Sequence, residues 1–313
     1  MTAVPVEAGP DAGAPWHYGD PYAEQRALQA GEAVVDLSHR PVVRVAGTDR
    51  LTWLHSLTSQ HLTGLRPGVL TQALVLSPHG HVEHHLVLVD DGEQVLAHVE
   101  PGTLEPLLNY LRSMVFWADI EVEDVTGEVA VVRTWTGDRF VQRAGLPATL
   151  DTMGRPAGLW AAEALRVAAG VPRLGFETDH RTIPAEVGWI GAAVHLDKGC
   201  YRGQETVARV HNLGRPPRRL VLLHLDGSDA QLPAHGDPVG TGDPDDARQL
   251  GFVGTAVRHY ELGPVALALV KRTVQDGAVL VAGSGDARVA AAVESVPAAA
   301  EPDVTTAAHP GPR

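Results

Sequence analysis

Two consecutive prolines, Pro216 and Pro217, separate two parts of the chain that differ in their predicted secondary structure. Each ring fixes φ and removes a backbone donor, so the pair forms a rigid break and a good domain boundary. From Arg219 onward the sequence predicts only strands, joined by turns rich in Gly, Pro and Asp: residues 220–225, 253–260, 265–271 and a Val279/Val281 pair. This pattern is typical of a small antiparallel barrel or sandwich.

The part before the prolines predicts a mixture of helices and strands. Predicted helices cover residues 21–29, a segment capped by Thr48 with leucines at 51, 54 and 57, a segment with leucines at 104–111, and residues 158–170 and 203–212. Predicted strands cover residues 33–38, 41–45, 72–76, 81–89, 94–99, 120–123 and 129–134. We therefore predict an α+β fold with a disordered tail at 1–15, an αβ region at 16–214, a β-module at 215–296 and a second disordered tail at 297–313.

Composition excludes several classes of function. The formal net charge is −13 over 313 residues, so we expect no direct nucleic-acid partner that is held by a general phosphate field. A single cysteine excludes an intrachain disulfide and a four-thiolate cluster within one chain. The N-terminus has no signal-peptide pattern, and no apolar run reaches the roughly 18 residues that a membrane span needs. These observations predict a cytoplasmic protein without a membrane partner.

Motifs of several common enzyme classes are absent from the sequence. It contains no phosphate-binding P-loop, no dinucleotide fingerprint after a strand, no Gly-x-Ser-x-Gly elbow and no His-Glu-x-x-His. The sequence therefore does not point to a nucleotide hydrolase, a Rossmann dehydrogenase or a standard hydrolase.

The segment from Lys198 to Arg209 carries the densest group of reactive and polar side chains. Cys200 lies between Lys198 and Arg202, and two nearby cations would stabilise its thiolate and lower its pKa. A helix that begins near Gly203 would add positive potential on the same side. The alternative is that Cys200 is a small buried residue in a tight glycine turn. On the residues alone both interpretations stay open.

A second candidate is the histidine-rich stretch with His79, His81, His84 and His85 around Glu83. On a strand, alternate residues share a face, so residues 81, 83 and 85 would point one way and His84 the other. The first three are of types that bind zinc, but no further ligand is near in the sequence. The spacing matches no common zinc motif. A solvated face of a β-ribbon is the simpler interpretation, and we predict no metal site.

The first candidate segment also carries a resemblance. Residues 198–205 read Lys-Gly-Cys-Tyr-Arg-Gly-Gln-Glu, and Val-Ala-Arg follows at 207–209. This resembles the signature of the YgfZ-type folate-binding proteins, relatives of the glycine cleavage T-protein, an aminomethyltransferase. Every fixed position of the signature is present. Weaker matches extend the resemblance over about residues 20–295: Val35–Arg40, Val45–Asp49, Leu165–Gly170, Ile183–Glu186, Gly251–Thr255 and Leu262–Ala268.

The resemblance implies a fold and a function. The fold would be a three-domain ring, with two interlocked αβ domains followed by an antiparallel β-barrel, and tetrahydrofolate would lie in its central channel. The function would be that of a tetrahydrofolate-binding accessory protein for iron–sulfur cluster assembly or repair, with an indirect effect on tRNA modification. Its partners would be a small-molecule folate and iron–sulfur cluster proteins.

The resemblance also implies which residues act. Cys200 would be a functional thiol assisted by Lys198. The residues predicted to contact folate, whose glutamate tail the cations would receive, are Lys198, Tyr201, Arg202, Gln204, Glu205 and Arg209.

The alternative function is folate-dependent aminomethyl transfer, and three departures weigh against it. T-proteins carry an assisting acid in the strand that matches 81–90, where this chain has His-Val-Glu-His-His-Leu at 81–86. Their pterin-clamping segment has only a poor counterpart at 135–138, and Ala168 replaces a usual glutamate. We therefore favour the accessory role over the enzyme, and whether any turnover occurs stays open.

Overall fold

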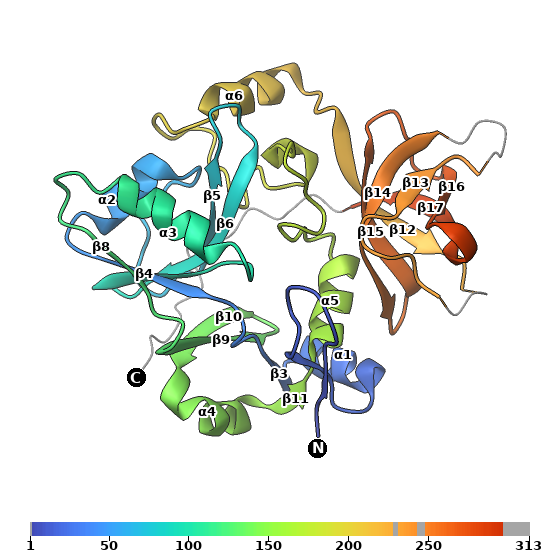
Figure 1. Cartoon of the computed structure of the whole chain (residues 1–313), viewed down its shortest axis with the longest axis horizontal. Helices are drawn as coiled ribbons and strands as arrows, with labels where there is room; N and C mark the ends of the chain where they lie inside the picture. Colours follow the sequence, from blue (N-terminus) through green and yellow to red (C-terminus); the bar gives the residue numbers. More distant parts are fainter. Residues whose placement is uncertain (1, 228–230, 243–247, 297–313) are drawn as a thin grey trace. The chain divides into compact units, whose positions relative to one another are not determined.

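The computed structural model describes residues 2–227, 231–242 and 248–296 (Figure 1). These form two compact units. The first unit contains residues 2–162 and 190–204, and the second contains residues 163–189 and the described residues from 205 to 296. The segment that carries most of the signature, 190–204, therefore belongs to the first unit. No helix in the described part of the chain combines the length and the apolar character that crossing a bilayer requires.

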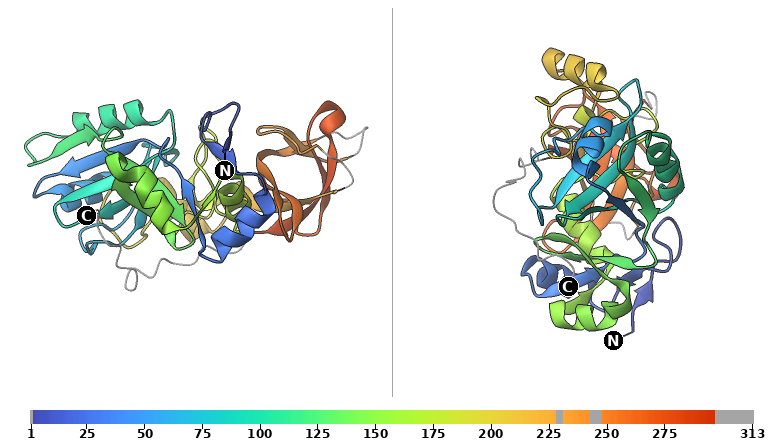
Figure 2. Two further views of the ribbon diagram at one scale, coloured as in Figure 1. Left: turned by 90° about the horizontal axis from the view of Figure 1, so that it is seen from below. Right: turned by 90° about the vertical axis from the view of Figure 1, so that its left-hand side faces the viewer.

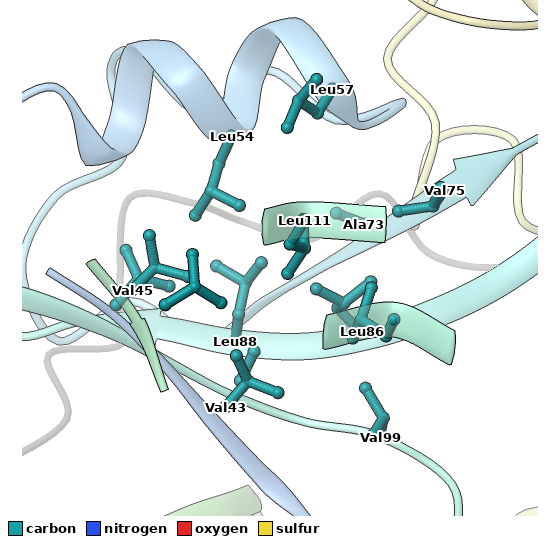
Figure 3. Packing of buried hydrophobic residues seen from close by; sticks show 14 of the residues in the cluster. Val43, Val45, Leu54, Leu57, Ala73, Val75, Leu86, Leu88, Val99 and Leu111 are labelled. Atoms are coloured by element: carbon teal, nitrogen blue, oxygen red, sulfur yellow. The ribbon is translucent and has the colours of Figure 1, made fainter. Parts of the chain in front are cut away.

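A five-stranded antiparallel sheet organises the first unit. Its strands run in the order β5 (Thr71–Leu76), β6 (Val82–Asp90), β7 (Gln94–His98), β4 (Val42–Ala46) and β8 (Glu121–Asp124). Helices α2 (Arg50–Leu57) and α3 (Leu104–Ser113) contribute leucines at helical spacing to its core. Figure 3 shows Leu54, Leu57 and Leu111 of these helices among Val43, Val45, Ala73, Val75, Leu86 and Leu88 of the strands.

The beginning of α2 differs from the prediction. Its N-cap is Asp49, and the predicted cap Thr48 instead donates its hydroxyl to Oδ2 of Asp119 at 3.0 Å. The predicted Thr48 cap is wrong because a partner distant in the sequence engages that hydroxyl.

A second, four-stranded sheet of the first unit has the order β10 (Gly137–Gln142), β9 (Val129–Thr134), β3 (Ala33–Asp36) and β11 (Arg155–Ala157). Strand β11 is parallel to β3, and the other pairs are antiparallel. Helix α1 (Pro21–Gln29) has its predicted bounds, and its N-cap is Asp20, whose carboxylate accepts the amides of Tyr22 and Ala23 at 3.1 and 3.0 Å. The sequence did not predict β10, β11 or helix α4 (Leu146–Met153).

The prediction of a disordered tail at 1–15 is wrong. Strand β1 (Val4–Pro5) pairs antiparallel with β2 (Pro15–His17), and Val6 and Ala14 continue the pairing through backbone hydrogen bonds. Gly9 and Gly13 have φ of 90° and 86°, which glycine adopts readily, so both residues allow the chain to turn. The same glycines give the segment a composition like that of a disordered tail. The second predicted tail, 297–313, lies outside the described residues.

The second unit contains a closed antiparallel barrel in the order β12 (Arg218–Leu225), β15 (Gly263–Lys271), β14 (Gln249–His259), β13 (Pro238–Gly240), β16 (Val279–Ala282) and β17 (Val289–Ser295). In Figure 2 these orange and red strands curve round to close on themselves. Alternate residues of β12 and β15, such as Val221 and Ala268, fill its interior. A 3-10 turn (Gly285–Ala287) lies between β16 and β17. The predicted α+β class with a C-terminal antiparallel barrel is confirmed.

Two helices lie where the chain passes between the units. Helix α5 (Leu159–Ala168) and helix α6 (Gln204–Leu213) match the helices predicted at 158–170 and 203–212. Residues 159–162 of α5 and Gln204 of α6 belong to the first unit, and the rest of both helices belongs to the second. Two further 3-10 turns are Arg143–Gly145 and Pro184–Glu186.

Candidate functional site

The candidate site is built around residues 190–204, which we call the signature loop. Its first half is fastened to the chain that follows α2. The Ser59 hydroxyl donates to the Ala193 carbonyl at 2.6 Å, and the His195 amide donates to the Ser59 carbonyl at 3.0 Å. The Gln60 side-chain amide donates to the Ala192 carbonyl at 3.2 Å. These bonds bring the second half of the loop to the C-terminal end of α2.

Lys198 caps that helix end. Its ammonium donates to the carbonyl oxygens of His55 and Thr58, which belong to the last turn and the C-cap of α2. Carbonyls at a helix end lack intrahelical partners and carry the negative end of the helix dipole, so a cation is favourable there. The side chain is buried, and this burial lowers the pKa of Lys198 to about 8. Lys198 therefore connects the signature loop to α2.

Tyr201 and Gln204 complete the inner side of the loop. The Tyr201 ring centroid lies 4.8 Å from the Lys198 ammonium, and burial raises the pKa of Tyr201 to about 12. The Gln204 side-chain amide donates to the Lys198 carbonyl at 3.2 Å. Three of the residues predicted to contact folate thus contact one another in the loop.

Gly203 allows the loop to approach the turn between β5 and β6. Its φ is 83°, and a Cβ atom there would lie 2.6 Å from the Ser77 carbonyl oxygen and 2.9 Å from the Gly80 Cα. A side chain would meet both backbone strain and backbone atoms that cannot easily move. Gly199, by contrast, has open space where its Cβ would stand.

Arg202 joins the signature loop to the histidine-rich stretch. Its guanidinium contacts both carboxylate oxygens of Glu83, at 3.1 and 3.4 Å, and its central carbon lies 5.4 Å from the Tyr110 ring centroid. The neighbouring His84 is buried, and that burial together with the Arg202 charge lowers the pKa of His84 to about 4. The sequence presented these two stretches as separate candidates, and it gave no signal for Tyr110.

The remaining predicted residues are exposed. The Cys200 thiol is free and exposed, so the alternative of a buried cysteine is wrong. Both cations predicted to flank it have other hydrogen-bond partners, namely the α2 carbonyls and Glu83. Glu205 and Arg209 are exposed on α6.

The histidine stretch does not assemble a metal centre. Within residues 2–227, 231–242 and 248–296 no three His, Cys, Asp or Glu side chains are placed to hold a metal ion. The His85 ring shares a hydrogen bond of 2.8 Å with the Gln72 side chain. His84 is only 8% exposed and shares its face of β6 with the buried Val82 and Leu86, as the alternation along a strand predicts.

Sequence reasoning missed a second group of histidines beside Lys198. The His61 ring centroid lies 4.9 Å from that of His55 and 5.3 Å from that of His195. Burial and then the Lys198 charge lower the pKa of His55. The two ends of this group are far apart in the sequence, so no local pattern could reveal it.

Comparison with known proteins finds distant relatives. No family model matches the chain. It is 25% identical over 252 residues to a putative chloroplastic transferase of Arabidopsis thaliana, covering 64% of this chain and 57% of that protein. It is 26% identical over 314 residues to an aminomethyltransferase of Rubrobacter xylanophilus, covering 84% of this chain and 82% of the relative.

A further relative belongs to a different functional class. The chain is 26% identical over 236 residues to a mitochondrial iron–sulfur cluster assembly factor, an IBA57 homologue, of Mycosarcoma maydis, covering 63% of this chain and 59% of that protein. Among solved structures, the glycine cleavage system aminomethyltransferase T of Bartonella henselae matches with a TM-score of 0.76 at 16% identity, covering 93% of both chains. This chain has the T-protein fold.

Glu83 and Asp138 lie in the two segments where the resemblance to T-proteins places acidic residues that act on folate. In this chain both carboxylates form ion pairs with arginines. Glu83 pairs with Arg202. Asp138 is buried, accepts from Arg133 at 2.6 and 2.8 Å and shares a hydrogen bond of 2.9 Å with His98. Arg133 and His98 outweigh burial and hold the pKa of Asp138 well below its usual range. Asp138 is therefore a structural anion at neutral pH.

Proposed function

We propose that the protein is a YgfZ-type, tetrahydrofolate-binding accessory factor for the assembly or repair of iron–sulfur cluster proteins in the cytoplasm, with an indirect effect on tRNA modification. The observation that carries the proposal is the signature loop, which exposes the Cys200 thiol while Lys198 and Arg202 fasten the loop on either side. The similarity to an iron–sulfur cluster assembly factor and to aminomethyltransferases supports it.

An exposed thiol on a fastened loop suits contact with another protein. One thiol cannot hold a cluster alone, because iron–sulfur clusters take several cysteine ligands. Cys200 would therefore act together with a partner, as one ligand or as one half of a redox exchange. The proposal requires no catalytic turnover by this chain.

We expect Cys200→Ser to lower the activity of iron–sulfur enzymes in cells that lack the wild-type protein, without changing the thermal midpoint of the purified variant. The thiol is exposed, so its replacement removes no packing. Gly199→Ala is the matched control, since a methyl group at that position meets open space. Full complementation by Cys200→Ser at normal protein levels would contradict a functional role of the thiol.

The second candidate function is folate-dependent aminomethyl transfer. The 26% identity to aminomethyltransferases of Rubrobacter xylanophilus and Geobacillus kaustophilus favours it. The arginine partners of Glu83 and Asp138 weigh against it, because a carboxylate that assists transfer must be available to the substrate.

Titration with tetrahydrofolate separates these functions. We expect saturable binding, no turnover with an aminomethyl-loaded donor protein, and about tenfold weaker binding by Arg202→Ala through loss of a charge-assisted contact. Of the residues predicted to contact folate in the loop, Arg202 is partly exposed and can be changed without opening a core. Arg215→Ala, an exposed arginine outside the signature, should bind like the wild type. Turnover would establish the transferase, and absence of saturable binding would remove the folate proposal.

A further inference from the structure

The segment between α3 and β8 exposes two adjacent aromatic side chains. Phe116 is 70% exposed and Trp117 is 96% exposed, and their ring centroids lie 5.9 Å apart. We call this pair the aromatic tip. Aromatic rings normally bury most of their surface, because they carry a large hydrophobic free energy. An adjacent exposed pair is therefore a feature that needs a physical reason.

Among the apolar side chains of residues 114–120, only Phe116 and Trp117 are exposed. Met114, Val115, Ala118 and Ile120 on either side of the pair pack against the core of the five-stranded sheet. The chain thus turns its smaller apolar side chains inward and its two largest outward. Poor packing of the whole segment does not explain this arrangement.

Hydrogen bonds hold both ends of the segment in place. Before the tip, the Trp53 indole donates to the Met114 carbonyl at 3.2 Å. After the tip, the Asp119 amide donates to Oδ2 of Asp49 at 3.2 Å. The Asp119 carbonyl also lies against Gly47, where any side chain would collide with it. The tip is therefore preorganised, which reduces the entropy cost of docking it into a partner.

The charges at the base of the tip define the chemistry of that partner. Asp49, Asp119 and Glu121 are exposed there, and the nearby Arg112 guanidinium donates to the Val122 carbonyl. Carboxylates at the rim disfavour an anionic lipid surface and nucleic acid. They complement a rim of lysine and arginine side chains on another protein.

We propose that the aromatic tip is a docking element that inserts into an apolar pocket, rimmed by Lys and Arg side chains, on a partner protein. Aromatic side chains that fill such pockets usually supply most of the binding energy of an interface. The acidic residues at the base steer the encounter and fix its orientation. This proposal does not depend on folate or on the Cys200 thiol.

The test places a photo-reactive benzoylphenylalanine at position 117 of the full-length chain, in cells that produce the protein naturally. Irradiation should join the tip to one protein, which is identified by mass spectrometry and purified. The dissociation constant of the complex between this purified protein and the chain should then rise about 30-fold for Trp117→Ser. Charge reversal by Glu121→Lys should slow association at low salt and have less effect at high salt.

Trp135 provides the matched control, because it is 53% exposed on another part of the same unit. Trp135→Ser should leave the affinity unchanged, and the photo-reactive residue at 135 should not join the same protein. Equal thermal midpoints of all variants show that folding is unaffected. Cross-linking only to a second copy of the chain, only to lipid or to nothing overturns the proposal, as does an affinity that Trp117→Ser leaves unchanged.

Discussion

Replacing Lys198 with methionine should lower the free energy of unfolding by about 3 kcal/mol and loosen the last turn of α2. Methionine keeps the length of the apolar stem but donates no hydrogen bond. The carbonyls of His55 and Thr58 would lose their ammonium partner, and each unsatisfied buried acceptor costs about 1–3 kcal/mol. Removing the buried charge, whose burial lowers the lysine pKa to about 8, offsets part of this loss. Denaturant unfolding and amide hydrogen exchange of residues 55–58 measure both effects.

Lys271→Met is the matched control for that experiment. Lys271 is exposed at the end of β15, so its replacement should change stability by less than about 0.5 kcal/mol. Equal stability of the two variants would show that Lys198 does not hold the helix end. The expected loss also bears on function, because a Lys198 variant that fails in cells can fail through its fold. Cys200→Ser is the cleaner test of the signature.

Sequence reasoning was most successful where the signals are local. Helix α1 has its predicted bounds because Asp20, Pro21 and Gly31 supply the cap, the first position and the stop within a few residues of one another. Four of the six barrel strands were predictable because apolar runs alternate with turn residues, whereas β13 and β17 were not predicted. Their closure into a barrel agrees with the same pattern.

The elements that sequence reasoning missed depend on distant partners. Strand β11 has only three residues and forms because β3 pairs with it in parallel, although more than a hundred residues separate them. The hairpin of β1 and β2 is short and rich in Pro and Gly, so its composition resembles a disordered tail. In both cases tertiary contacts outweigh weak local preferences.

The candidate site also combines features that the local sequence reveals with contacts that depend on distant residues. The signature was visible because its residues are consecutive in the sequence. The partners of its cations were not visible, since Lys198 reaches carbonyls 140 and 143 residues earlier and Arg202 reaches a carboxylate 119 residues earlier. These contacts change the interpretation of both cations from activators of a thiol to anchors of the loop that carries it.

The protein should lose stability steeply as the pH falls from 6.5 to 4. Burial lowers the pKa of His84 and of His85 from 6.5 to about 4, so both rings stay neutral in the folded protein. The same histidines take up protons near pH 6.5 when the chain unfolds. The unfolded state therefore binds more protons in this window, and acidification favours it. The full stabilisation is present above pH 6.5, and each shift corresponds to at most about 3 kcal/mol lost by pH 4. Urea unfolding between pH 7.5 and 4.5 measures this slope.

His84→Leu should make that slope shallower. Nδ1 of His84 is buried and has no hydrogen-bond partner among the described residues, so leucine removes a buried polar atom that no contact compensates. We expect the variant to be at least as stable as the wild type at pH 7.5 and to lose up to about 3 kcal/mol less by pH 4. His79→Leu, at an exposed position of the preceding turn, should follow the wild-type profile. If His84→Leu keeps the wild-type slope, the acid sensitivity arises from other groups, such as His98, whose pKa burial also lowers.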